Sequence, residues 1–211
     1  MTLDDAILQR RSVRGFLAQE VPDATIREVL ELAQWSPSNC NVQPWLPQVV
    51  SGVALATLRD ALVTAALAQQ PFDPDWPADG KYHGVYRERQ HDAAARLYGA
   101  MGVERRDLEG RHAAYLHNHL CFDAPHAVFI FMQAPFDTRE AADIGMYAQT
   151  LMLALTSRGP SKFLSRDKLI LGGYISFSLY MVHTVWYGLW RTIMRAAGIT
   201  TPPVPRRRVA R

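Results

Sequence analysis

The chain changes character between Ser157 and Arg158, and this break constrains its fold more than any other feature. Of its 211 residues, 1–157 contain 13 Lys and Arg against 19 Asp and Glu, a net charge of −6, whereas 158–211 contain 10 against 1, a net charge of +9. The longer part is large enough to bury a core of its own. We therefore expect a folded domain over residues 1–157 and a basic, apolar tail over residues 158–211.

Composition excludes several classes of protein. Hydrophobic residues make up 48% of the chain, which is too many for a disordered protein. Cys40 and Cys121 are the only cysteines, so no disulfide framework is expected and a reducing compartment is favoured. The start of the chain lacks the pattern of a secretory signal, which indicates a cytoplasmic protein. Because the basic excess lies in the tail and forms no stripe along the body, nucleic acid is not expected as a partner.

The pattern of apolar residues predicts helices interleaved with a few short strands. Thr2 and Asp5 form a capping box for a first helix, and Ile26, Val29, Leu30 and Ala33 recur at helical spacing in a second. A run of apolar residues over 127–132 is typical of a buried central strand. Further helices are predicted over 53–69, 85–99, 105–117 and 140–156, and a strand over 48–51. The class is α+β or α/β.

Three motifs follow one another at a characteristic spacing. They are Arg10-Arg11-Ser12-Val13-Arg14, Pro37-Ser38-Asn39-Cys40-Asn41-Val42-Gln43-Pro44-Trp45 and Asp143-Ile144-Gly145-Met146-Tyr147-Ala148-Gln149-Thr150-Leu151-Met152-Leu153. Together they resemble the FMN-dependent nitroreductase family over about residues 3–157. Arg105-Arg106-Asp107 and Phe122-Asp123-Ala124-Pro125 are similar to its nitrobenzoate and nitrophenol reductase branch, which usually has Gly where Asp123 stands. The resemblance implies an α+β fold of helices around a small mixed sheet, here incomplete at its C-terminal end.

The arginine cluster suits a phosphate. Three guanidinium groups and a hydroxyl at a helix end provide charge-assisted, partly bidentate hydrogen bonds to a dianion such as the phosphate of FMN. By resemblance, Arg10 and Ser12 bind the phosphate and ribityl chain, Arg11 supports them, and Arg14 faces the pyrimidine side of the flavin ring. A guanidinium there stabilises the negative charge of the reduced flavin.

The second motif is expected to act across a subunit interface. In the family, the residues matching Pro37, Ser38, Asn39 and Asn41 cover the flavin of the other subunit, with Gln43 assisting, which implies a homodimer. NADH or NADPH would reduce the flavin, and a nitroaromatic, quinone or similar small-molecule acceptor would reoxidise it. The flavin carries the chemistry, so no catalytic side chain is required.

Each motif also has a simpler interpretation. An arginine cluster after a helix is usually a solvated face, and Ser-Pro-Ser-Asn is a helix stop. The apolar stretch from Gly145 to Leu155 is, in isolation, core. His117, His119 and Cys121 would share one face of a strand and could bind a metal, although the apolar context favours packing and no metal is predicted. Cys40 is either redox-active or a small core thiol.

The tail departs from the nitroreductase pattern. Residues 169–190 contain no charged side chain, and as a helix they would span about 33 Å, enough to cross a bilayer. Residues 161–198 resemble a late membrane helix of the sugar O-acyltransferases, a family that needs far more membrane helices than this chain has. The tail therefore predicts an appended apolar helix, with membrane association. The alternative function is an inactive fused or frameshifted fragment tethered to the membrane, and the alternative structure is an ordinary core or interface helix.

Overall fold

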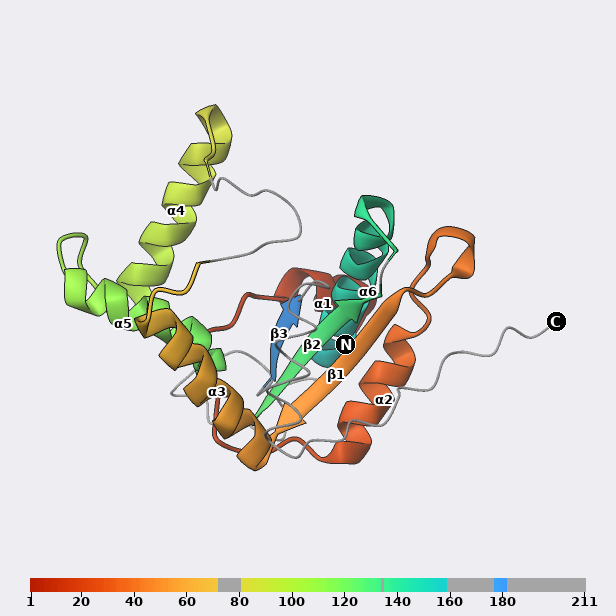
Figure 1. The fold of residues 1–211 in the computed structure, drawn as a ribbon. Coiled ribbons are helices and arrows are strands. Elements are labelled where there is room, and N and C mark those ends of the chain that lie inside the picture. Colours follow the sequence, from red (N-terminus) through yellow and green to blue (C-terminus); the bar gives the residue numbers. More distant parts are fainter. Residues whose placement is uncertain (72–80, 134, 159–176, 182–211) are drawn as a thin grey trace.

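A three-stranded mixed sheet lies at the centre of the computed structural model, which describes residues 1–71, 81–133, 135–158 and 177–181. The strand order is β1 (Trp45–Ser51), β2 (His126–Met132) and β3 (Phe177–Met181), as Figure 1 shows. β1 runs antiparallel to β2, and β3 runs parallel to it. The predicted α+β fold with helices around a small sheet is confirmed.

β2 is buried along its whole length because both faces of the sheet are covered. Val128, Ile130 and Met132 point to a core shared with α2 (Asp23–Ala33) and α6 (Thr138–Ser157). Ala127, Phe129 and Phe131 point to the opposite core, shared with α3 (Gly52–Leu67). Side chains of a strand alternate between the two faces, so a strand covered on both sides is apolar throughout.

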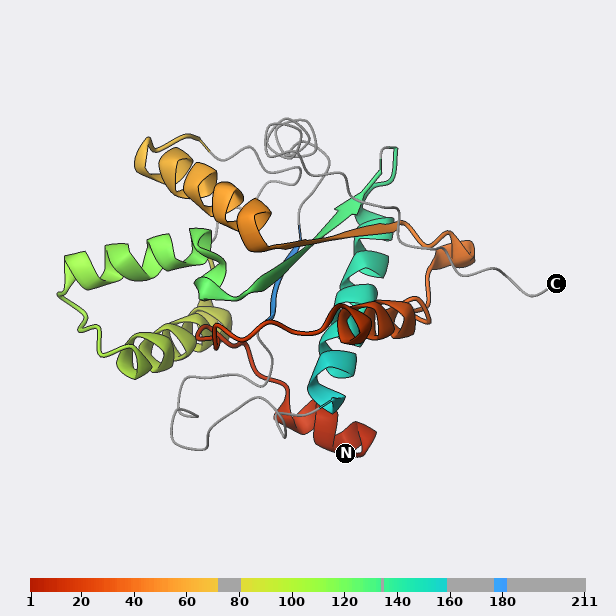
Figure 2. The same cartoon turned by 90° about the horizontal axis from the view of Figure 1, so that it is seen from below.

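The remaining helices surround this centre. α1 (Leu3–Gln9) begins at the predicted Thr2–Asp5 capping box and packs against α6. α4 (Gly84–Ala100) and α5 (Leu108–His119) extend from one end of the sheet (Figure 2), and α4 contains no buried residue. Two short 3-10 turns, η1 (Asn39–Asn41) and η2 (Cys121–Asp123), precede β1 and β2.

α6 leaves one face exposed in the single chain, although its sequence is apolar nearly all round. Tyr147 and Leu151 are fully buried, but Ala142, Gly145, Met146 and Gln149 are exposed. These four residues recur at i, i+3, i+4 and i+7, so they form one continuous face of the helix. We call them the α6 open face. They carry no charge.

The predicted apolar helix over 169–190 is wrong where the structure describes it. Phe177–Met181 is a strand, hydrogen-bonded along β2 in parallel register from His126 to Ile130. An uncharged run suits a strand next to a buried strand as well as it suits a membrane helix, and sequence alone does not separate the two. The rest of that run, and the closing arginines, lie outside the described residues. Among the helices that are described, none combines the length and the apolar character needed to cross a membrane.

Candidate functional site

The arginine cluster lies on the segment that leaves α1. The N–H of Arg10 closes the helix by donating to Ala6 O at 3.0 Å, and the backbone then becomes extended. Arg11, Ser12 and Arg14 are exposed, and Arg10 is half-buried. Arg11 donates to the carbonyls of Leu8 and Arg10, and Arg14 donates to Ser12 O at 3.4 Å.

No carboxylate neutralises this cluster within the described part of the chain. The ion pairs found there are His117–Asp123, Arg139–Glu140 and Arg158–Glu28, and none includes Arg10, Arg11 or Arg14. Three like charges within five residues therefore stand without an acidic partner among the described residues. That arrangement suits an anionic ligand.

The segment beyond the arginines is attached to the start of β2. The guanidinium of Arg14 lies over the ring of Phe122, with Cζ 5.9 Å from the ring centroid. The N–H of Val21 donates to Nε2 of His126 at 2.9 Å. His126 is buried, and burial lowers the pKa of its imidazole. Its Nε2 must be unprotonated to accept this bond, so the contact requires the neutral form.

The second motif folds into a tight, left-handed turn. Cys40, Asn41 and Gln43 all have positive φ, at 47°, 57° and 49°. The Ser38 hydroxyl accepts the N–H of Gln43 at 3.0 Å, and the Gln43 amide donates to Asn41 Oδ1 at 3.1 Å. Oε1 of Gln43 is buried and has no protein partner among the described atoms. Pro37 is exposed at the start of the turn.

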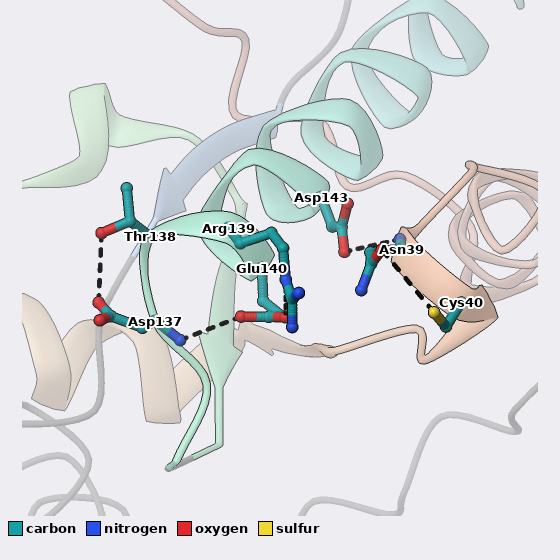
Figure 3. A network of polar contacts seen from close by, with 7 residues as sticks. All are labelled: Asn39, Cys40, Asp137, Thr138, Arg139, Glu140 and Asp143. Atoms are coloured by element: carbon teal, nitrogen blue, oxygen red, sulfur yellow. Dashed lines mark hydrogen bonds and ion pairs between the residues drawn. The ribbon is translucent and has the colours of Figure 1, made fainter.

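Asp143 attaches this turn to α6. Its Oδ2 accepts the N–H of Asn39 at 3.1 Å, and the residue is only 3% exposed. Figure 3 shows this contact beside a second one at the start of α6, where Glu140 accepts from Arg139 at 2.8 Å and from the N–H of Asp137 at 3.2 Å. The bonds from Arg139 and Asp137 lower the pKa of Glu140. Sequence reasoning did not identify Asp143 as an anchor, although a carboxylate on the buried face of a helix was the available signal.

The exit of the turn is fixed by an aromatic pair. Trp45 stacks on Tyr147 of α6 at 4.8 Å between ring centroids, and its indole N–H donates to Gln34 Oε1 at 2.8 Å. The Gln34 amide contacts the Tyr147 hydroxyl at 3.4 Å. Burial raises the pKa of Tyr147, so this hydroxyl stays protonated. The turn is therefore fixed at Asn39 and at Trp45.

The two predicted segments lie at opposite ends of the sheet. η1 leads into Trp45, which pairs with Met132 at the end of β2, whereas Arg14 and Val21 contact residues at or just before the start of β2. Seven paired residues separate these ends, a distance of about 20 Å. Figure 2 shows the red chain after α1 reaching the end of the sheet away from η1. One chain does not bring the two segments together.

The alternative metal site at His117, His119 and Cys121 is not formed. α5 continues to His119, so the strand geometry that would align the three groups is absent, and Cys121 is buried in η2. His117 lies 2.8 Å from Asp123, and His119 contacts Tyr115 O. Over the described ranges, no cluster of three or more His, Cys, Asp or Glu could hold a metal ion. Cys40 is exposed, which excludes its interpretation as a core thiol.

Comparison with known proteins adds independent evidence. Residues 7–161 match the model of the nitroreductase family. The chain is 43% identical over 151 residues to the nitroreductase NfnB of Mycolicibacterium smegmatis, covering 71% of this chain and 64% of that protein. It is 36% identical over 163 residues to a 4-nitrobenzoate reductase of a Nocardioides strain, covering 74% of this chain and 66% of that protein. The chain therefore spans about two thirds of the length of these relatives.

Solved structures agree with the sequence matches. The FMN-dependent nitroreductase NfnB from Mycobacterium smegmatis, solved in complex with NADPH, superposes with a TM-score of 0.70 at 41% identity, over 74% of this chain and 70% of that one. The FMN and NADPH-dependent NfnB of a Sphingopyxis strain superposes with the same TM-score at 30% identity, over 75% of this chain and 72% of that one. Nothing in these comparisons supports the resemblance of residues 161–198 to membrane acyltransferases. Sequence, fold and matched length together show that the chain belongs to the nitroreductase family.

Proposed function

We propose that this chain is an FMN-dependent oxidoreductase that takes electrons from NADPH or NADH and passes them to a nitroaromatic, a quinone or a similar acceptor. The names of its relatives support this reaction, since two solved NfnB structures are described as FMN-dependent and one contains NADPH. The 4-nitrobenzoate reductase among the relatives supports a nitroaromatic acceptor. Residues 1–157 are proposed to carry the flavin site.

The unneutralised arginine cluster is the observation that carries the proposal. A dianionic phosphate placed among Arg10, Arg11, Ser12 and Arg14 would receive charge-assisted hydrogen bonds without displacing an existing ion pair. Arg11 is already oriented by two backbone carbonyls, which reduces the entropy that it loses on binding a ligand. In this assignment Arg10 and Ser12 contact phosphate and ribityl oxygens, and Arg14 lies beside the ring.

A second copy of the chain would complete the site. Pro37, Ser38, Asn39 and Asn41 lie at the opposite end of the sheet from the arginine cluster of their own chain, so they would cover the flavin of the partner. Gln43, whose N–H the Ser38 hydroxyl accepts at the end of the turn, would assist. The α6 open face gives the dimer an uncharged helical surface with a glycine at its centre, which permits close approach of two backbones.

The protein's own part in the reaction is binding and orientation. FMN, when bound, supplies the electron-transfer chemistry. Neither segment contains Asp, Glu or His, so neither offers a conventional acid or base at neutral pH. The arginines fix the phosphate and the position of the ring, and Asp143 fixes the turn that would exclude water from the far side.

Purification of the full-length chain tests the proposal against the alternative of an inactive, membrane-tethered fragment. A yellow protein with flavin absorbance, whose absorbance is bleached by NADPH or NADH and restored by a nitroaromatic or quinone, is the expected result. Parallel assays with the two nicotinamides identify the electron donor. A colourless protein that does not take up added FMN, and that is released from membranes only by detergent, would refute the proposal and support the fragment.

A further inference from the structure

The η2 turn has an unusual backbone. Cys121, Phe122 and Asp123 have φ of 53°, 53° and 58°, three successive residues in the left-handed region without a glycine among them. Side chains with a Cβ disfavour this conformation, and a run of three persists only where the surroundings hold it. Backbone strain of this kind clusters at active sites and ligand-binding sites.

Contacts on three sides hold the turn in place. Cys121 is fully buried in the core beside Leu55 and Leu58 of α3. The guanidinium of Arg59, also from α3, donates to the carbonyl of Ala124 immediately after the turn. Nε2 of His117, near the end of α5, lies 2.8 Å from Asp123 Oδ2. The turn is therefore fixed to both neighbouring helices.

In this geometry the ring of Phe122 contacts the side chains of His117 and Arg14. The His117 ring approaches it edge-on, with centroids 5.4 Å apart and planes at 81°. The Arg14 guanidinium lies over the ring at 5.9 Å. Asp123 follows Phe122 directly in the sequence. Its carboxylate contacts His117, and no ion pair joins it to Arg14. Arg14 is thus oriented by a ring that leaves its charge unneutralised.

We propose that Phe122 is a positioning residue for Arg14 in the flavin site. Stacking on an aromatic face holds a guanidinium in place while its N–H groups stay free for acceptors in the plane. A carboxylate in the same place would orient Arg14 but would also neutralise it. The assignment rests on the proposed function, because it gives Arg14 its ligand.

A double-mutant cycle on the full-length chain tests this role. FMN affinity is measured by quenching of flavin fluorescence for the wild type, Phe122→Leu, Phe122→Tyr, Arg14→Ala and Arg14→Ala with Phe122→Leu, and thermal unfolding is recorded for each. Phe122→Leu should weaken FMN binding about two- to five-fold, the range for a cation–π contact at a partly exposed site. Phe122→Tyr, which keeps an aromatic face, should bind FMN as the wild type does.

The decisive comparison is the effect of Phe122→Leu without Arg14. If Phe122 acts through Arg14, the Leu substitution has no further effect on FMN affinity in the Arg14→Ala background. An equal loss in both backgrounds, or wild-type affinity for Phe122→Leu, would overturn the positioning role and leave the proposed function intact. A wild-type chain that binds no FMN would overturn the proposed function, and this assignment with it.

Discussion

A single substitution at Gly145, at the centre of the α6 open face, tests whether this face forms the dimer interface. A Cβ added at this position meets no atom within 4 Å in the single chain. Replacing a glycine inside an exposed helix by Ala adds about 1 kcal/mol to the free energy of unfolding through helix propensity alone. In a monomer, larger residues at this position are therefore tolerated.

In the proposed dimer, the same open space is occupied by the second copy. A Trp at this position enters a twofold interface twice, and overpacking costs about 1–3 kcal/mol per site. Gly145→Trp should therefore weaken dimerisation by about 2–6 kcal/mol, or at least about 30-fold. Sedimentation velocity over a range of protein concentrations measures this effect, and flavin occupancy should fall with it because ligand and dimer are linked by mass action.

Gly99 provides a matched control, since it also lies in a helix, α4, and an added Cβ there also meets nothing within 4 Å. Gly99→Trp should leave the dimer intact, which shows that an exposed helix accepts the side chain. If Gly145→Trp dimerises as strongly as the wild type, the α6 open face is not the interface. The second copy would then not lie against Gly145, and the proposed dimer would be wrong in its contact surface.

Three further predictions concern single contacts. Arg14→Ala should weaken FMN binding by about 1.5–3 kcal/mol, the range for a hydrogen bond to a charged group, with Arg14→Lys keeping part of the affinity; equal titration curves for wild type and the Ala variant would contradict the assignment. Asp143→Ala leaves the Asn39 N–H without its acceptor and should lower the free energy of unfolding by about 1–3 kcal/mol in urea titrations, whereas Asp143→Asn keeps an acceptor oxygen and should recover most of it. Because burial lowers the pKa of His126 in the folded state, the unfolded chain binds the proton more readily, so stability should fall as pH drops below the ordinary value of 6.5. Urea titrations at about pH 7.5 and 5.5 should show a smaller difference for His126→Gln than for the wild type, and an unchanged difference would exclude His126 as the cause.

Local patterns were sufficient to predict most of the elements. The spacing of Ile26, Val29, Leu30 and Ala33 predicted the buried face of α2, and all four are buried. The continuous apolar run predicted β2, because a strand covered on both faces has no polar side to show. The Thr2–Asp5 capping box fixed the start of α1, since both of its hydrogen bonds form within four residues.

Contacts between distant parts of the chain were beyond such reasoning. Asn39 and Asp143 are 104 residues apart, and Val21 and His126 are 105 apart, so no local rule connects them. The three motifs identified the segments of the candidate site. The arginine cluster and the turn after α2 lie at opposite ends of the sheet, which follows only from the register of β1 and β2. This separation is why a second copy of the chain is needed to complete the site.

The change in net charge at 157/158 does not coincide with a boundary of the sheet, because β3 comes from the basic tail. β2 carries hydrogen-bonding groups along both edges, and β1 satisfies only one of them. Phe177–Met181 pairs with the other edge, so the sheet takes a strand from each side of the charge break at 157/158. A central, fully buried strand needs a partner on each edge, because backbone groups left unpaired away from water cost free energy. An uncharged run is compatible with a strand paired to β2 as well as with a membrane helix, so the charge pattern alone does not separate the two.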